Sequence, residues 1–76
     1  MTFKEATDRL LGLGVDLREI ADALQLGHQT VRAMRAAEGA RAFRTPPPPE
    51  VWREPLVRLA RERIDGLQRF VRDAGK

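Results

Sequence analysis

A run of four prolines, Pro46 to Pro49, constrains this chain more than any other feature of its sequence. Proline lacks a backbone N–H and fixes φ, so consecutive prolines interrupt a helix and favour the extended polyproline II conformation. We therefore predict a stiff proline-rich linker over residues 38–49, which separates a segment of residues 1–37 from a segment of residues 50–76. A second role for the run, as a polyproline ligand of another domain, stays open.

Hydrophobic periodicity and capping residues predict three helices before the linker and one after it. The expected helices cover residues 3–13, 17–24, 28–37 and 55–74. The first two each begin with a capping box, formed by Thr2 with Glu5 and by Asp16 with Glu19. Pro55 fits the first turn of the fourth helix, where no N–H is needed. No segment alternates as a strand does, so we expect an all-α fold: a three-helix core, the linker and a long C-terminal helix.

The composition excludes several kinds of site. The 76 residues include no cysteine, no serine and one histidine, so disulfides, thiolate–metal sites, two-histidine zinc sites and serine triads are ruled out. We expect no cofactor and no metal. A domain this small buries only about 60% of its unfolded surface. We therefore expect a second copy of the chain to supply the missing stability.

No segment of the sequence is suited to a membrane. The apolar runs are only a few residues long, far below the roughly 20 residues that cross a bilayer. The N-terminus also lacks the pattern of a signal peptide. We therefore expect a cytoplasmic protein without a membrane partner.

Charge is distributed unevenly along the chain. Residues 1–27 carry three basic and five acidic side chains, whereas residues 28–49 carry four arginines and a single acid. Residues 50–76 carry seven basic and five acidic side chains, and the whole chain has a net charge of +3. A basic segment that begins abruptly at His28 suits an anionic partner.

The segment from Leu17 to Ala36, LREIADALQLGHQTVRAMRA, predicts two helices that cross closely after a tight turn. Small Ala21 lies at the crossing, and the apolar residues expected to line the facing sides and fill the turn are Ile20, Leu24, Leu26, Val31 and Met34. With these residues the segment resembles the helix-turn-helix family of DNA-binding regulators. The resemblance implies a small prokaryotic or phage transcription regulator, whose three-helix core contains a helix-turn-helix.

Two residues depart from the usual pattern of this family. Gln25 stands where the family usually has glycine, at a position whose left-handed backbone costs other residues about 1 kcal/mol or more. Gly27 stands where the family often has a serine that caps the second helix, and glycine is an acceptable N-cap. Both departures concern the geometry of the turn, and neither breaks the motif.

In this family the second helix enters the major groove of DNA with its N-terminal residues first. Carried over to this sequence, the resemblance implies base contacts from His28, Gln29, Arg32 and Ala33. Glutamine can bridge adenine N6 and N7, arginine can bridge guanine O6 and N7, and an alanine methyl can touch that of thymine. The expected contacts to the DNA backbone come from Arg18, Gly27, Thr30, Arg35, Arg41 and Arg44. Each of these residues could instead be an ordinary solvated residue of an exposed surface.

Arg41 and Arg44 flank Phe43 in the linker. A basic arm in this place could follow a DNA phosphate or enter the minor groove. Alternatively, Phe43 anchors the linker on the core while the arginines remain in solvent. We expect both Phe43 and Trp52 to be packing residues rather than platforms for a base.

The apolar stripe of the fourth helix, from Leu56 to Val71, is longer than a three-helix core can cover. A second copy of the stripe would cover it and give a two-fold dimer. The predicted interface consists of Leu56, Leu59, Ala60, Arg63, Ile64, Leu67, Phe70 and Val71. Arg63 lies inside the apolar arc, so it requires an acid such as Glu62 or Asp65 of the other subunit, or it reaches water. The alternative is a fourth helix that folds back on its own core.

These features together predict a sequence-specific regulator that binds double-stranded DNA, most simply a dimeric repressor of a palindromic operator. The alternative is a helical protein-interaction module that uses the C-terminal helix and has no specific DNA binding. An enzyme is not expected, because no base, nucleophile and pocket converge and the acids serve as caps or lie on solvated faces.

Overall fold

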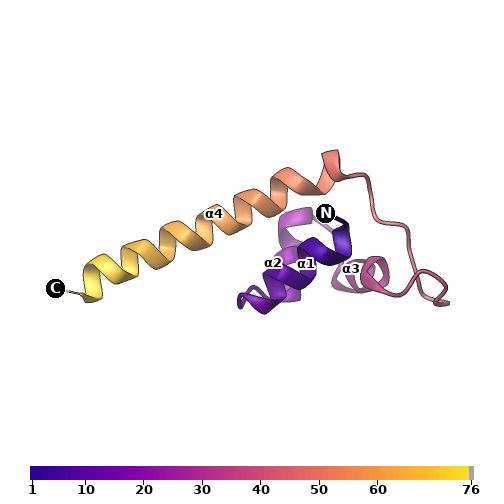
Figure 1. Ribbon diagram of the computed structural model, residues 1–76, viewed down its shortest axis with the longest axis horizontal. Helices are drawn as coiled ribbons and strands as arrows, with labels where there is room; N and C mark the ends of the chain where they lie inside the picture. The colour runs from indigo at the N-terminus through magenta and orange to yellow at the C-terminus, as the bar shows by residue number, and fades with distance from the viewer. Residues whose placement is uncertain (76) are drawn as a thin grey trace.

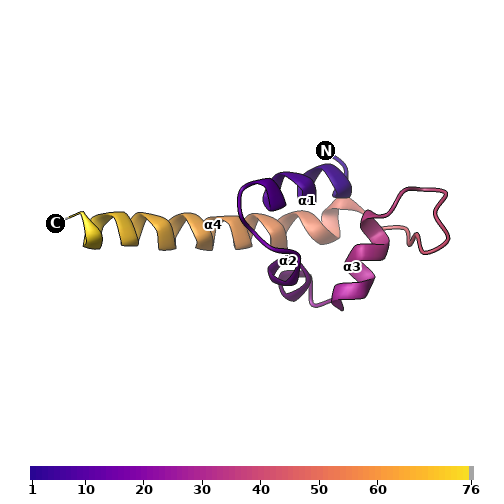
Figure 2. The same cartoon turned by 90° about the horizontal axis from the view of Figure 1, so that it is seen from below.

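The computed structural model describes residues 1–75, in which four α-helices follow one another. They are α1 (Phe3–Gly12), α2 (Leu17–Leu24), α3 (His28–Arg35) and α4 (Pro49–Ala74). The first three form a compact cluster, and α4 runs along this cluster and then extends away from it (Figure 1; Figure 2). The molecule is accordingly elongated, with extents of 52 × 21 × 20 Å. The all-α class and the long C-terminal helix are confirmed.

The capping boxes that were predicted for the first two helices are both present. The Thr2 hydroxyl accepts a hydrogen bond from the Glu5 N–H, and the Glu5 carboxylate accepts one from the Thr2 N–H, each at 3.1 Å. Asp16 and Glu19 make the same reciprocal pair at 2.9 Å. The bond from the Thr2 backbone is the main cause that lowers the pKa of the Glu5 carboxyl.

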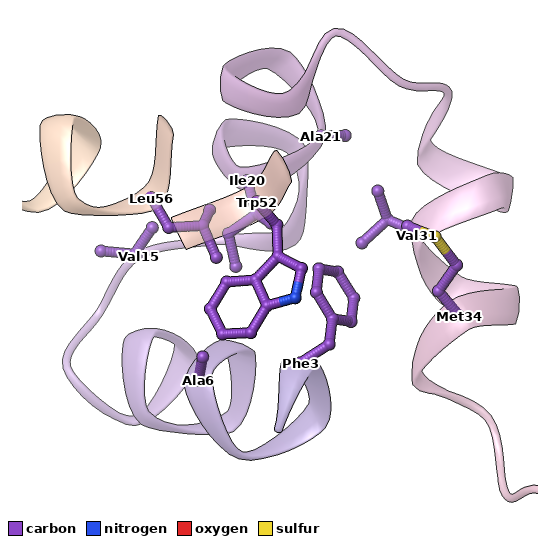
Figure 3. Close-up of a cluster of buried hydrophobic side chains, with 9 residues drawn as sticks. All are labelled: Phe3, Ala6, Val15, Ile20, Ala21, Val31, Met34, Trp52 and Leu56. Atoms are coloured by element: carbon purple, nitrogen blue, oxygen red, sulfur yellow. The ribbon is translucent and has the colours of Figure 1, made fainter. Parts of the chain in front are cut away.

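The hydrophobic core takes side chains from all four helices (Figure 3). Its buried members are Phe3, Ala6, Val15, Ile20, Ala21, Val31, Met34, Trp52 and Leu56. Trp52 of α4 meets Phe3 of α1 edge-on, with ring centroids 5.8 Å apart and an interplanar angle of 75°, a favourable aromatic geometry. The N-terminal part of α4 therefore belongs to the same core as the three-helix cluster.

α4 starts at Pro49, six residues before the predicted start at Pro55. Pro49 occupies the first turn of the helix, where its missing N–H has no partner to lose. Pro55 lies inside the helix, which costs about 3 kcal/mol. Trp52 and Leu56, on either side of it, are buried, and burial of each large apolar side chain contributes about 2 kcal/mol or more. Tertiary packing thus outweighs the local cost of the proline.

The segment between α3 and α4, residues 36–48, loops out at the end of the molecule opposite the C-terminus (Figure 1). α3 ends at Arg35, two residues earlier than predicted. The backbone N–H of Arg44 donates to the carbonyl of Ala33 at 3.1 Å and so ties the loop to the end of α3. Phe43 is half-buried, as expected of a residue that anchors the loop.

Candidate nucleic-acid interface

α2 and α3 are joined by a turn of three residues, Gln25 to Gly27. Gln25 has φ 56° and ψ 40°, so the left-handed backbone predicted at this position is present. The N–H of Leu26 donates to the carbonyl of Ala21 at 3.0 Å, which closes the end of α2. Gly27 is extended and acts as the N-cap of α3 without a side-chain hydrogen bond.

The facing sides of α2 and α3 are apolar, as the sequence predicts. Ile20 and Val31 are fully buried, and Ala21 and Met34 are nearly so. Leu26 is the exception, because 36% of its surface is exposed and it does not fill the turn. The contacts between α2 and α3 are therefore made by the buried side chains where the two helices cross, and not by a side chain in the turn.

The outward side of α3 is polar and open to solvent. His28, Gln29 and Arg32 are exposed, and Thr30 and Ala33 are half-buried. α3 lies at the edge of the cluster, and α4 extends away from it on the other side (Figure 2). The outward side of α3 is therefore accessible to a large partner.

The loop after α3 carries two more predicted contact residues. Arg44 is exposed and its backbone is bonded to Ala33, which places the loop beside the C-terminal end of α3. Arg41 is exposed in the same loop. Within residues 1–75 no ion pair involves Arg32, Arg41 or Arg44. These three guanidinium groups are therefore available to an anion.

Arg35, predicted to contact the DNA backbone, is engaged within the chain. Its Nε donates to the hydroxyl of Thr7 at 2.8 Å, and its Nη2 pairs with the carboxylate of Asp8. Only 20% of the Arg35 side chain is exposed. Hydrogen bonds from Lys4 and then from Arg35 lower the pKa of the Asp8 carboxyl. Arg35 thus holds α3 against α1, a role that the sequence analysis missed, and Arg18 remains exposed on α2.

The residues of the predicted dimer interface divide into two groups. Leu56 is buried in the core of its own chain, and Leu59 packs partly against that core. Arg63 bonds to both carboxylate oxygens of Glu19, at 2.7 and 2.6 Å, so its acidic partner is in its own chain and not in a second subunit. Ile64, Leu67, Phe70 and Val71 are between 52% and 67% exposed. The alternative of a fourth helix that folds back on its own core therefore describes the first part of α4, and the second part is uncovered.

Residues 1–75 contain neither a candidate metal-binding group nor a helix suited to span a membrane. Among residues 1–75 no group of three or more metal-ligating side chains comes together. None of the described helices combines the length and the apolar character needed to cross a bilayer. Comparison of the chain with protein-family models, with curated proteins and with solved structures gives no match.

Proposed function

We propose that the protein is a sequence-specific transcription regulator that binds double-stranded DNA through a helix-turn-helix formed by α2 and α3. The observation that carries the proposal is the exposed polar side of α3, which joins His28, Gln29 and Arg32 to the basic loop beside it. An α-helix is about 10–12 Å across with its side chains, and the major groove is about 12 Å wide. The outward side of α3 therefore has the size and the chemistry that groove readout requires.

The exposed residues of α3 suit direct readout of base edges. Gln29 can bridge N6 and N7 of adenine, and Arg32 can bridge O6 and N7 of guanine. His28, Gln29 and Arg32 are spaced i, i+1 and i+4, so they can address neighbouring base pairs from one side of the helix. Ala33 offers only a methyl group, which can contact the methyl group of thymine.

Contacts to the DNA backbone would fix the register of α3 in the groove. Gly27 and Thr30 present the N-terminal turn of α3, whose backbone N–H groups favour phosphate. Arg41 and Arg44 follow from the loop at the other end of α3, and Arg18 follows from α2. The proposal includes a homodimer on a palindromic operator, most simply a repressor that occludes a promoter.

Selection of duplexes from a random pool, followed by titration of the selected site, tests the proposal. Arg32→Ala should relax the preference at one base pair by about 1–3 kcal/mol, or about 5- to 150-fold in relative affinity. Arg69→Ala is the matched control, because Arg69 is an exposed arginine on the distal part of α4. An unchanged preference in the Arg32 variant would refute the assignment of α3 as the reading helix.

A protein-interaction module is the second candidate, and the uncovered apolar side chains of α4 favour it. The two functions differ in their dependence on salt. Duplex binding should weaken steeply between 50 and 200 mM salt, because phosphate contacts release condensed counterions, whereas an apolar contact should change little. No affinity for any duplex at low salt would reject the regulator in favour of the interaction module.

A further inference from the structure

α4 carries a second apolar line, distinct from the one that packs on its own core. We call it the α4 seam, and it consists of Val57, Ala60, Ile64, Leu67, Val71 and Ala74. These residues alternate in steps of three and four, which is the spacing of positions a and d in a coiled coil. The four large ones are between 43% and 67% exposed. At 100° per residue the seam is rotated by about 80° from the line of Trp52, Leu56 and Leu59.

We infer that the α4 seam binds the same seam of a second copy of this chain, in antiparallel orientation. The inference rests on the proposed dimer and is independent of DNA binding. Valine or isoleucine occupies every a position and leucine or alanine every d position, so the whole seam is apolar at the spacing of a coiled coil. The seam is thus suited to one partner helix of its own kind.

The sizes of the seam residues favour the antiparallel orientation. In an antiparallel pair centred between Ile64 and Leu67, each Val71 meets Ala60 of the second copy, and each Val57 meets Ala74. Every layer then joins a large side chain to a small one or isoleucine to leucine, which packs without gaps. A parallel pair would instead place Ala60 against Ala60 and Ala74 against Ala74, and the cavities left in those layers are destabilising.

An apolar groove at the start of the seam fits the same orientation. The groove lies between α1 and α4, has a volume of about 430 Å³, and is lined in part by Met1, Leu10, Leu13, Val57 and Ala60. Val57 and Ala60 belong to both the groove and the seam, so the two apolar surfaces are continuous. Leu13 and Met1 are 81% and 63% exposed.

In the antiparallel pair the C-terminal end of one α4 lies level with the groove of the other copy. Phe70 and Val71, each 67% exposed, then face the groove that Leu13 and Met1 border. Each copy binds the C-terminal end of the other copy's α4 in its groove. The interface is therefore symmetric about a two-fold axis, and it leaves no free surface for a third copy.

The orientation also sets the distance between the two copies of the helical cluster. The Leu56 residues of the two copies lie about 30 Å apart along the helix axes, since each residue of an α-helix rises 1.5 Å. The clusters, each with its α3, are therefore at opposite ends of the dimer. If the proposed DNA function holds, the half-sites are at least about one helical turn apart.

Sedimentation without DNA tests the interface. Leu67→Glu should raise the dimer dissociation constant at least about tenfold, because two carboxylates would be buried in the seam. Arg69→Glu is the control and should leave the constant nearly unchanged, since position 69 faces away from the seam. Leu67 is 57% exposed in the single chain, so circular dichroism should show both variants folded. A monomeric parent chain, or equal dissociation constants for the two variants, would overturn the inference.

Spin labels test the orientation, because the chain has no cysteine of its own. Asp65→Cys and Arg72→Cys place labels at two exposed positions one heptad apart. In the antiparallel dimer the two labels are offset along the axes by about 2 Å at position 65 and about 20 Å at position 72. The measured separation should therefore be clearly larger at position 72. Equal separations at both positions would overturn the antiparallel pairing, whatever the result with DNA.

Discussion

Replacement of Trp52 by alanine should remove a large part of the stability of the fold. Trp52 is 4% exposed and is the residue through which α4 meets α1, edge-on to Phe3. A buried tryptophan replaced by alanine costs about 3–5 kcal/mol, of which the pair with Phe3 supplies about 0.5–1.5 kcal/mol. A 76-residue domain has a total stability of about 4–11 kcal/mol at the usual value per residue. The substitution therefore removes a large part of the free energy of unfolding.

Urea denaturation followed by circular dichroism measures this loss. Val51→Ala is the control, because Val51 is the adjacent residue of α4 and is 55% exposed. It should change the free energy of unfolding by less than about 0.5 kcal/mol. Trp52→Phe should lie between the two variants, since it keeps an aromatic ring against Phe3. A loss below about 1 kcal/mol in the alanine variant would refute the packing of α4 on the core.

Three further predictions concern the turn and the contacts of α1. Gln25→Gly should raise the free energy of unfolding by about 1 kcal/mol in the same urea assay, because Gln25 has φ 56° and glycine adopts this conformation without strain. An unchanged urea midpoint would contradict backbone strain at Gln25. Arg35→Met should lower the free energy of unfolding by about 1–2 kcal/mol, because the bond to buried Thr7 is lost. An unchanged free energy of unfolding would show that this bond does not stabilise the fold. The folded-state pKa values of Glu5 and Asp8 are below their ordinary values of 4.5 and 3.8. The stability that these carboxylates contribute is therefore present above the ordinary values and is lost as pH falls through the folded-state pKa values. A urea midpoint independent of pH below 5 would argue against this contribution.

Local signals made the helices of the N-terminal half predictable from the sequence. The capping boxes of Thr2 with Glu5 and of Asp16 with Glu19 act within three residues, so they mark the same helix starts in the sequence and in the structure. In both boxes the residues that determine the structure are neighbours in the chain. The left-handed backbone at Gln25 was instead implied by the resemblance to the helix-turn-helix family.

Long-range contacts decided the features that the sequence did not predict. α4 begins at Pro49 and buries Trp52 against α1, whereas the sequence analysis expected Trp52 to pack but placed the start of the helix at Pro55. Arg35 pairs with residues of α1 that lie 27 and 28 positions away. Burial of Thr7 gave no signal of this pairing, because its hydroxyl already donates to the carbonyl of Phe3 at 2.9 Å within α1.

Glu19 connects the two proposed surfaces of the molecule. Its carboxylate caps the start of α2 by accepting from the Asp16 N–H at 2.9 Å, and it also binds the guanidinium of Arg63 on α4. The charge-assisted bonds fix α4 against the helix that packs on α3. Arg63 is the last residue of α4 in contact with the cluster through such a bond, and the large seam residues from Ile64 onward are each more than half exposed. Together with the packing of Trp52 and Leu56, this ion pair fixes the direction in which the seam leaves the cluster. In the proposed dimer the fold of each chain would thus determine the orientation of α3 relative to the second copy, and loss of Glu19 would loosen that relation without removing a residue from either surface.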